Sequence, residues 1–462
     1  ARRVIWPPSE LSSLGPHLGV GEPVSVDVSL DPKFHAPQLD KECSMKIVPE
    51  SIPFGRFVAL DIHKHYVLVG GMNSLKEWVL RPRKVRMSRF PEWVQKNLKS
   101  TDVVVLESTS NAWDVYDLVS PLVAKALVAN PLKVGQIAGA KVKTDKLDIE
   151  RLLILLIADI VPEVWVPPDH VRDLRALISH RWRIHKQIAM TKNRLHSFIH
   201  RFNLIPPEGP LFSEKNLAWW QEQEFSSMVS LQIEQDLLIL EHLTAHKEAI
   251  HQELACLSNR DPWSKDMVFL MQIPGLGVVL SMTVLSAIGD ISRFENAKKL
   301  VGYAGLGAGV HDSGLKHQGK GITKSGRKEL RWAMVEAAWG AVRSDTHWKA
   351  QFEHLKDRGK HSNAAIVAIA RKLLVSIWHM LSKSEPHRYS TEEDLAYKIL
   401  IWSQRMDEEA LRGMTRQQFA KYGLLRLGKG LELTRIVRNG LPRHIAPTNE
   451  VLALLPELNL LE

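Results

Sequence analysis

The stretch TDVVVLES at residues 101–108 holds four consecutive apolar side chains and then the acid Glu107. A run of Val and Leu without polar alternation is typical of a strand that is buried on both faces, as strands of parallel sheets are. Two earlier stretches, RFVALDI (56–62) and HYVLVG (65–70), are also rich in β-forming residues and predict a hairpin that turns at residues 62–64. The sequence therefore predicts a sheet with a fully buried strand in this part of the chain.

Segments with helical spacing alternate with these strands. Helices are expected at residues 89–98, 111–122 and 144–157, and short strands at 78–80 and 126–128. Alternation of this kind indicates an α/β fold. Further along, residues 171–202 and 231–257 repeat apolar side chains at helical intervals and predict a long helical hairpin. Long arms of this kind usually pack against a copy of themselves.

Composition places the chain among ordinary globular proteins with an excess of positive charge. Its 462 residues include 61 Lys and Arg against 51 Asp and Glu, which gives a formal net charge of +10, and 45% are hydrophobic. These values exclude a disordered, collagen-like or mucin-like chain, and the length suggests roughly two to four domains. The charge indicates an acidic partner, most simply nucleic acid.

Cysteine usage and hydropathy favour the cytosol. Cys43 and Cys256 are too few for a disulfide framework or a four-ligand zinc site, which favours a reducing compartment. The longest apolar run, residues 152–166, contains two acids and a proline and is too short and polar to cross a bilayer. Residues 1–10 lack the apolar segment of a secretory signal. We therefore expect a cytoplasmic protein with no membrane partner.

Changes in composition predict five segments. Residues 1–54 form an extension rich in Pro, Ser and Gly, 55–164 the α/β domain, 165–260 the helical hairpin, 261–345 a Gly-rich basic unit, and 346–462 a helical extension. The last segment holds the basic stretch LLRLGKGLELTRIVR. Its GKG is not a phosphate loop, because the upstream glycine and the Ser or Thr after the lysine are missing.

Acidic side chains stand at strand ends and on one helix face of the α/β domain. They are Asp61, Glu107, Asp145 and Asp148. Asp145 and Asp148 share a helix face because they are three residues apart. Four such acids in a basic protein could hold two divalent cations, which activate phosphate oxygens. Taken singly, each acid is more often a cap or a solvated side chain. His63 and His65 flank Asp61 and could bind a metal, but we interpret this pair as surface polar residues.

The Gly-rich basic unit offers a serine among cations. The stretch IPGLGVVLSMTVLSAIGD (273–290) has the form of a helix–hairpin–helix turn, in which backbone N–H groups near Gly275 and Gly277 can face a phosphate. A Gly-rich loop follows with Ser313 and then Lys316, Lys320, Lys324, Arg327, Lys328 and Arg331. Such a serine could attack a phosphate held by the cations. The alternative is a phosphate-binding loop with a capping serine.

One helix of the predicted hairpin is also basic. Residues 179–201 contain six Lys or Arg and no acid, among them Arg181, Arg183, Lys186, Lys192 and Arg194. We expect them to contact an RNA or DNA backbone. The alternative is a solvated basic face.

Taken in order, the motifs resemble a known family. VALDIHKH, VVVLEST, NPLKVGQIAGAKVKTDKLD, IPGLGVVLSMTVLSAIGD, FENAKKLVGYAGLG, HDSG and ITKSGRKELR span roughly residues 55–345. This series resembles the DEDD transposases of the one-ten insertion-sequence family, which are RNA-guided bridge recombinases related to the pilin-gene invertases. Two positions depart from the family pattern, where Ala308 replaces a usual proline and Asp312 precedes the serine.

The resemblance implies a fold and a set of roles. It implies an α/β N-terminal domain of the RuvC-like, ribonuclease-H fold, a coiled-coil hairpin, and a mainly helical transposase domain with a helix–hairpin–helix-like element. It places Asp61, Glu107, Asp145 and Asp148 as ligands of Mg²⁺ or Mn²⁺ and Ser313 as the nucleophile, with Ser325 as the rival serine. It further implies donor and target DNA, a structured guide RNA, and a homodimer or homotetramer in the prokaryotic cytosol, associated with the nucleoid.

Three functions remain open from the sequence. The leading hypothesis is a recombinase that cuts and rejoins DNA through a phosphoserine link, with targets chosen by the guide RNA. A metal-dependent junction nuclease would use only the acids and water and form no covalent intermediate. A non-catalytic nucleic-acid-binding relative would need neither the acids nor the serine.

Overall fold

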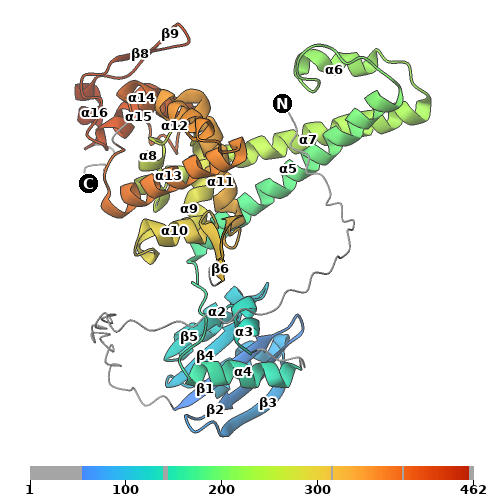
Figure 1. The fold of residues 1–462 in the computed structure, drawn as a ribbon, viewed down its shortest axis with the longest axis vertical. Coiled ribbons are helices and arrows are strands. Elements are labelled where there is room, and N and C mark those ends of the chain that lie inside the picture. The colour runs from blue at the N-terminus through green and yellow to red at the C-terminus, as the bar shows by residue number, and fades with distance from the viewer. Residues whose placement is uncertain (1–54, 139–143, 314–315, 388–389, 457–462) are drawn as a thin grey trace, which may run out of the picture. The chain divides into compact units, whose positions relative to one another are not determined.

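The chain divides between Val164 and Trp165 into two units (Figure 1). The computed structural model describes residues 55–138, 144–313, 316–387 and 390–456. The predicted extension, residues 1–54, lies outside the described residues.

A five-stranded mixed sheet forms the centre of unit 1. Its strands are β1 (Arg56–Ile62), β2 (Tyr66–Met72), β3 (Trp78–Arg86), β4 (Asp102–Glu107) and β5 (Lys125–Ala129), in the spatial order β3-β2-β1-β4-β5. The pairs β1–β2 and β2–β3 are antiparallel, whereas β1–β4 and β4–β5 are parallel. The predicted strands are therefore confirmed. β3 is longer than predicted because it is an edge strand with four basic residues at exposed positions, which weakens its apolar signal.

Helices flank this sheet where helical spacing predicted them. They are α1 (Phe90–Asn97), α2 (Ala112–Val119) and α4 (Asp145–Ile157), with short 3₁₀ turns η1 (Met87–Arg89) and η2 (Ser120–Leu122). An unpredicted helix, α3 (Pro131–Ala138), follows β5. Helix α4 covers one face of the sheet, where its Ile149, Leu152 and Leu153 pack against β-strand side chains such as Ala59 and Val105 (Figure 1).

Gly70 in β2 allows α4 to approach the sheet. A Cβ atom at Gly70 would lie 2.6 Å from Cγ2 of Ile149 and 3.1 Å from the ring of Trp78. We expect Gly70→Ala to destabilise unit 1 by roughly 1–3 kcal/mol, because overpacking forces buried groups apart. Hydrogen exchange of the amides in β1 and α4 measures this change.

The matched control is Gly135→Ala on α3, where an added Cβ meets no atom within 4 Å. That change is expected to be neutral or slightly stabilising, because alanine favours helix more than glycine does. Equal protection of β1 and α4 in the wild type and in Gly70→Ala would contradict the tight approach.

Unit 2 begins with the predicted helical hairpin. α5 (Asp169–Arg201) and α7 (Ser227–Ser258) contain 33 and 32 residues and lie side by side (Figure 1). A short helix, α6 (Glu214–Gln221), lies in their connection. The pattern of buried residues such as Leu174, Ile188 and Leu195 confirms the helical spacing read from the sequence.

The rest of unit 2 is mainly helical. Its elements are α8 (Trp263–Leu270), α9 (Val278–Ile288), η3 (Ile291–Arg293), α10 (Ala297–Tyr303), β6 (Ala308–Ser313), β7 (Lys316–Ile322), α11 (Lys328–Ser344), α12 (Thr346–Asp357), α13 (Ser362–Lys383), α14 (Glu392–Ser403), α15 (Arg416–Leu425), β8 (Arg435–Arg438), β9 (Leu441–His444) and α16 (Thr448–Leu454). α13 is long and apolar enough to cross a bilayer by length and composition alone. Its Ile369, Leu373 and Ile377 are buried in the core of unit 2, as in central helices of folded proteins.

One expectation for unit 2 was wrong and another was incomplete. The segment around Ser313 was expected to be a loop, but its backbone forms the antiparallel ribbon β6–β7. The segment 346–462 is mainly helical over its described residues, as expected, and it also contains the ribbon β8–β9. Both ribbons are short and rich in Gly, Lys, Arg or His, so they lack the apolar alternation by which strands are recognised in a sequence.

Candidate active site

Two of the predicted acids stand at neighbouring strand ends in unit 1. β1 and β4 pair in parallel as far as Leu60 and Leu106, so Asp61 and Glu107 follow side by side at the same edge of the sheet. The strand order also reverses here, since β2 and β3 extend the sheet on one side of β1 and β5 extends it on the side of β4. Ligands of open α/β sheets bind outside the carboxyl ends of strands at such a reversal.

The first turn of α4 supplies the other two acids. Thr144 caps the helix by accepting a hydrogen bond from the backbone N–H of Leu147, and Asp145 and Asp148 follow in the first turn. Asp148 lies 3.1 Å from the guanidinium of Arg151. Because the apolar face of α4 packs on the sheet, its first turn is held near the end of β1. The predicted spacing thus puts both acids on one side of the helix.

Asp61 is the buried member of this group, with an exposed fraction of 8%. Burial raises the pKa of Asp61, the nearby His63 opposes that rise, and the charges of Asp145 and Asp148 add to it. Three of the predicted acids therefore interact electrostatically, and the fourth, Glu107, is half-buried at the adjoining strand end. An additional cation would relieve the repulsion between these carboxylates.

Sequence reasoning set His63 aside, but the structure places it within the acidic group. Its Nε2 lies 3.1 Å from Oδ2 of Asp61 and 3.7 Å from Oδ2 of Asp145. One ligand atom from each of these three residues lies within 4.8 Å of the other two. The signal was present in the sequence, since His63 follows a strand-ending acid by two residues. His65 is exposed, as expected.

Tyr66 and Lys84 were also missed by sequence reasoning. The hydroxyl of Tyr66 donates a hydrogen bond of 3.1 Å to Oδ2 of Asp145, and its ring stacks on His63 at 4.4 Å. The ammonium of Lys84 lies 3.9 Å from Oδ2 of Asp145. Both residues lie on strands that pair in register, so only the folded sheet brings them to α4.

The donor set fits a divalent cation. Carboxylate oxygens suit Mg²⁺ and Mn²⁺, and an imidazole nitrogen is compatible with the softer of the two. Asp61 and Asp145 would be the ligands, with His63 able to join them, and Asp148 and Glu107 stand next to this position. The arrangement is therefore consistent with a site for a divalent metal.

The predicted serine lies in unit 2. Ser313 is the last residue of β6, and its backbone pairs with Lys316 of β7. The rival Ser325 is exposed, between Lys324, whose φ is 55°, and Gly326, whose φ is 129°. A Cβ at Gly326 would lie 2.3 Å from the carbonyl oxygen of Tyr303, so the turn next to Ser325 is packed against α10.

The helix–hairpin–helix element connects α8 to α9. Gly275 has a φ of 82°, and a Cβ there would lie 2.0 Å from the carbonyl oxygen of Ala337 in α11. Gly275 therefore serves the packing of the turn against α11. Gly277 is the N-cap of α9, and an added Cβ would meet nothing within 4 Å.

The predicted nucleic-acid contacts differ in their surroundings. Arg183 and Lys186 of α5 are exposed, whereas Arg181 donates a hydrogen bond of 2.9 Å to His251 and Arg194 pairs with Asp236. Lys192 lies over the ring of Phe212 at 5.0 Å. Those near the serine are Lys316 and Lys320 on β7, the exposed Lys324 and Lys328, and the half-buried Arg327 and Arg331. Arg331 donates to the carbonyl of Ala304, so it has a structural role as well.

The region with the acids and the region with Ser313 each match a family model. Residues 58–203 match a model described as "Transposase", of the DEDD type of IS110, and residues 267–353 match one described as "Transposase IS116/IS110/IS902 family". The chain is similar to "Putative transposase y4qE" of Sinorhizobium fredii, with 26% identity over 59% of this chain and 73% of that protein. It is also similar to the "Pilin gene-inverting protein" of Moraxella bovis, with 26% identity over 64% of this chain and 85% of the relative. The "Transposase for insertion sequence element IS1111A" of Coxiella burnetii is 25% identical over 47% of this chain and 60% of its own length.

Proposed function

We propose that this chain, which carries two regions matched by transposase family models, moves an insertion sequence. We further propose that it acts through a phosphoserine intermediate under the direction of a structured guide RNA. The observation that carries the proposal is the group Asp61, His63 and Asp145 at the strand reversal of one matched domain. The serine-bearing ribbon lies in the other matched domain. An enzyme of this class cleaves and rejoins DNA.

We assign unit 1 to the RuvC-like, ribonuclease-H type of fold. Three antiparallel strands followed by two parallel ones, in the order β3-β2-β1-β4-β5, support this assignment. Acids at the ends of β1 and β4 and on a helix that packs on the sheet support it further. The remaining domain boundaries, at residues 54/55, 260/261 and 345/346, stay predictions.

Ser313 supplies the nucleophile in this proposal. Its hydroxyl oxygen attacks the scissile phosphorus as its proton is removed, and the bond from phosphorus to one sugar oxygen breaks. The leaving sugar oxygen takes up a proton and becomes a hydroxyl. The phosphoserine ester keeps the bond energy, so a sugar hydroxyl of another strand can attack it, rejoin the DNA and release the serine.

The acidic group has the role of stabilising the negative charge that develops on oxygen atoms in these steps. Asp61, Glu107, Asp145 and Asp148 would hold Mg²⁺ or Mn²⁺, which when bound neutralises phosphoryl and leaving-group oxygens. The Tyr66 hydroxyl and the Lys84 ammonium orient Asp145. His63 stands within reach of both Asp61 and Asp145 and can hold a proton or act as a ligand between them.

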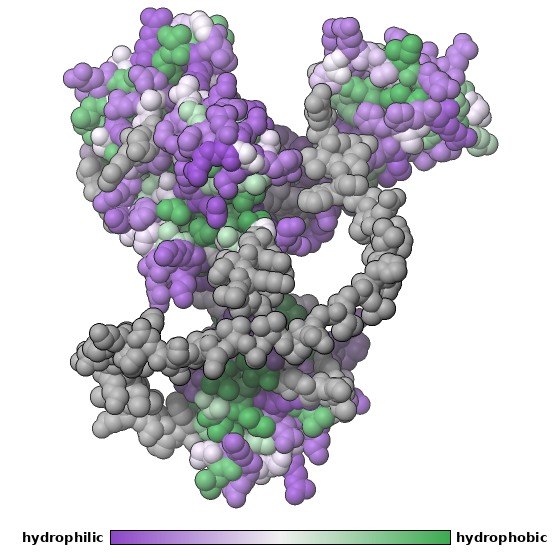
Figure 2. Space-filling view, viewed as in Figure 1, coloured by the Kyte–Doolittle hydropathy of each residue, from purple (hydrophilic) through white to green (hydrophobic). Residues whose placement is uncertain are grey.

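The proposed partners are donor DNA, target DNA, a guide RNA and further copies of the chain. Base pairing to the RNA would read sequence, and the protein would read shape and charge through residues such as Arg183 and Lys186. α7 exposes Met228, Leu231 and Leu238 on one face, with exposed fractions of 71%, 51% and 56%. Apolar side chains also reach the surface near α6 (green in Figure 2). These faces support a dimer or tetramer.

The test uses the full chain with its candidate RNA and end-labelled donor and target DNA in Mg²⁺. We expect a protein–DNA adduct that survives denaturant and heat, and we expect EDTA to prevent it. Strand cleavage without an adduct would contradict the recombinase proposal and favour a hydrolytic nuclease that uses the acidic group alone. Tight binding without cleavage, unaffected by EDTA, would favour the non-catalytic relative.

A further inference from the structure

The ribbon β8–β9 lies outside both matched regions. Its turn consists of Asn439 and Gly440, with φ of 52° and 74°. Two consecutive residues with positive φ form the tight turn that best suits a two-stranded ribbon. Within unit 2 the ribbon projects beyond helices α14 to α16 (Figure 1). Residues 433–449 contain three arginines and a histidine and no acid.

The inner face of the ribbon is attached to α14. Ile436 is buried, and Arg443 opposes it across the ribbon. Arg438 forms an ion pair of 2.6 Å with Asp394. The guanidinium carbons of Arg438 and Arg443 lie 5.5 Å and 5.4 Å from the ring centroid of Tyr397. These contacts fix the orientation of the ribbon and therefore fix which face points outward.

The outer face carries a different set of side chains. The cross-strand pairs on this face are Arg435 with His444 and Val437 with Pro442, and all four residues are exposed. Val437 has an exposed fraction of 61%. The cationic pair lies at the base of the ribbon, and the apolar pair lies toward its tip. Such a face combines charge for a polyanion with apolar groups that can contact sugars or base edges.

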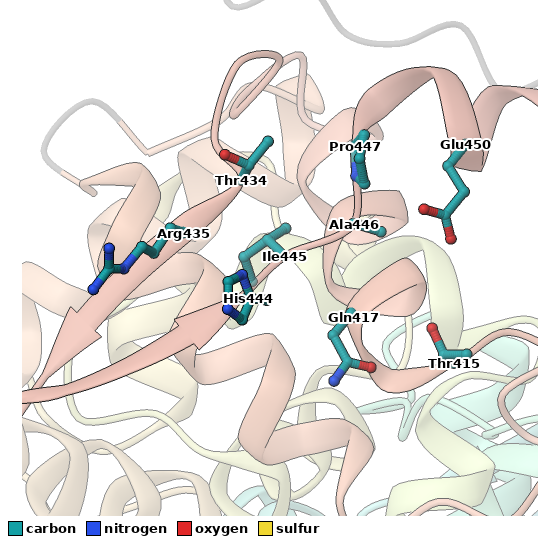
Figure 3. A pocket seen from close by; sticks show the side chains of 9 residues that line it. All are labelled: Thr415, Gln417, Thr434, Arg435, His444, Ile445, Ala446, Pro447 and Glu450. Carbon is teal, nitrogen blue, oxygen red and sulfur yellow. The ribbon is translucent and has the colours of Figure 1, made fainter.

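A groove of about 400 Å³ adjoins this outer face at its base. Arg435 and His444 of the ribbon line it together with Thr415 and Gln417 of the α15 region and Glu450 of α16 (Figure 3). In that view His444 and Gln417 border the middle of the groove, and Thr415 and Glu450 lie at one end. The outer face therefore continues into a mixed polar and apolar surface, with the carboxylate of Glu450 at the end away from Arg435.

The base of the ribbon is held in place from inside. Lys421 of α15 is fully buried, and its ammonium donates to the carbonyls of Gly430, Leu431 and Leu433 at 2.7, 3.3 and 2.7 Å. These carbonyls belong to the segment that leads into β8. The ribbon thus leaves a fixed base, and its outer face needs little ordering when it binds a partner.

We propose that the outer face of the β8–β9 ribbon binds duplex DNA, with Arg435 against a phosphate and Val437 and Pro442 in the adjoining groove. A two-stranded ribbon fits the major groove of B-form DNA, whereas the major groove of A-form RNA is too narrow. The absence of acids in residues 433–449 complements a polyanion. The choice of DNA as the ligand rests on the proposed function.

The experiment measures binding of the full chain to a short labelled duplex by fluorescence anisotropy, in EDTA and without guide RNA, so that no strand is cut. Arg435→Glu is expected to weaken DNA binding roughly tenfold and to lower the slope of log affinity against log salt by about one unit. Val437→Ser is expected to weaken binding severalfold with little change in the slope. The matched control is Arg358→Glu, since Arg358 is an exposed arginine at the end of α12.

Equal binding by the wild type, Arg358→Glu and both ribbon variants would overturn the proposal, as would a wild type without affinity for duplex DNA. If the ribbon variants lost affinity only for duplex RNA of the same sequence, the ligand of the ribbon would be RNA and not DNA. A change in oligomer mass in the absence of nucleic acid would assign the ribbon to a second copy of the chain. None of these outcomes depends on the covalent adduct, so the ribbon and the serine chemistry can fail separately.

Discussion

Replacement of Ser313 by alanine is expected to abolish the covalent protein–DNA adduct and strand exchange. Without the hydroxyl no phosphoserine can form, and loss of a serine nucleophile typically lowers turnover by a factor on the order of 10⁶. The backbone of Ser313 pairs with Lys316 through main-chain groups that alanine keeps, so the ribbon β6–β7 should persist. A denaturing gel with end-labelled donor DNA measures the adduct.

Ser325→Ala is the matched control for Ser313→Ala. Ser325 is exposed and lies in the turn before α11, a different element from β6. We expect this variant to form the adduct at the level of the wild type. Loss of the adduct in Ser325→Ala together with its survival in Ser313→Ala would transfer the nucleophilic role to Ser325.

The second large effect is expected from Asp61→Asn. Asparagine keeps the shape of the side chain but removes the charge that would bind the cation, so adduct formation should fall by at least about 10²–10³-fold. Calorimetric titration with Mn²⁺ should show weaker binding in parallel. In EDTA the variant should be no less stable than the wild type, because burial disfavours the carboxylate of Asp61 and raises its pKa.

Asp114→Asn controls for loss of an acid elsewhere in unit 1. Asp114 is exposed in the first turn of α2, and it is not part of the group around Asp61. Adduct formation and Mn²⁺ binding are expected to match the wild type in this variant. If Asp61→Asn formed the adduct at the level of the wild type, the acidic group would have no part in the reaction.

Much of the fold could be predicted because long apolar patterns specify it. The buried run Val103 to Leu106 and the repeats of α5 and α7 are strong signals, and the corresponding elements are found where they were expected. The ribbons β6–β7 and β8–β9 were missed because they are short and many of their residues are small or charged, so only strand pairing makes them regular. Local composition does not encode such pairing.

In the candidate site, too, local features could be predicted and features that depend on the folded structure could not. The acids were recognised because each ends a strand or begins a helix, which is a local feature. Their approach depends on the register of β1 with β4 and on the contact of Ile149 with Gly70, neither of which is local. His63 was set aside because a histidine after a strand is usually solvated, and only the position of Asp145 changes that interpretation.

The buried lysine at the base of the β8–β9 ribbon also bears on how this protein meets a polyanion. Lys421 directs its charge to three main-chain carbonyls, and Lys429 similarly donates to the carbonyls of His387 and Ser390. Part of the formal charge of +10 is therefore used inside the fold. These two ammonium groups are held by main-chain carbonyls, so they are less available to a polyanion than exposed cations such as Lys186.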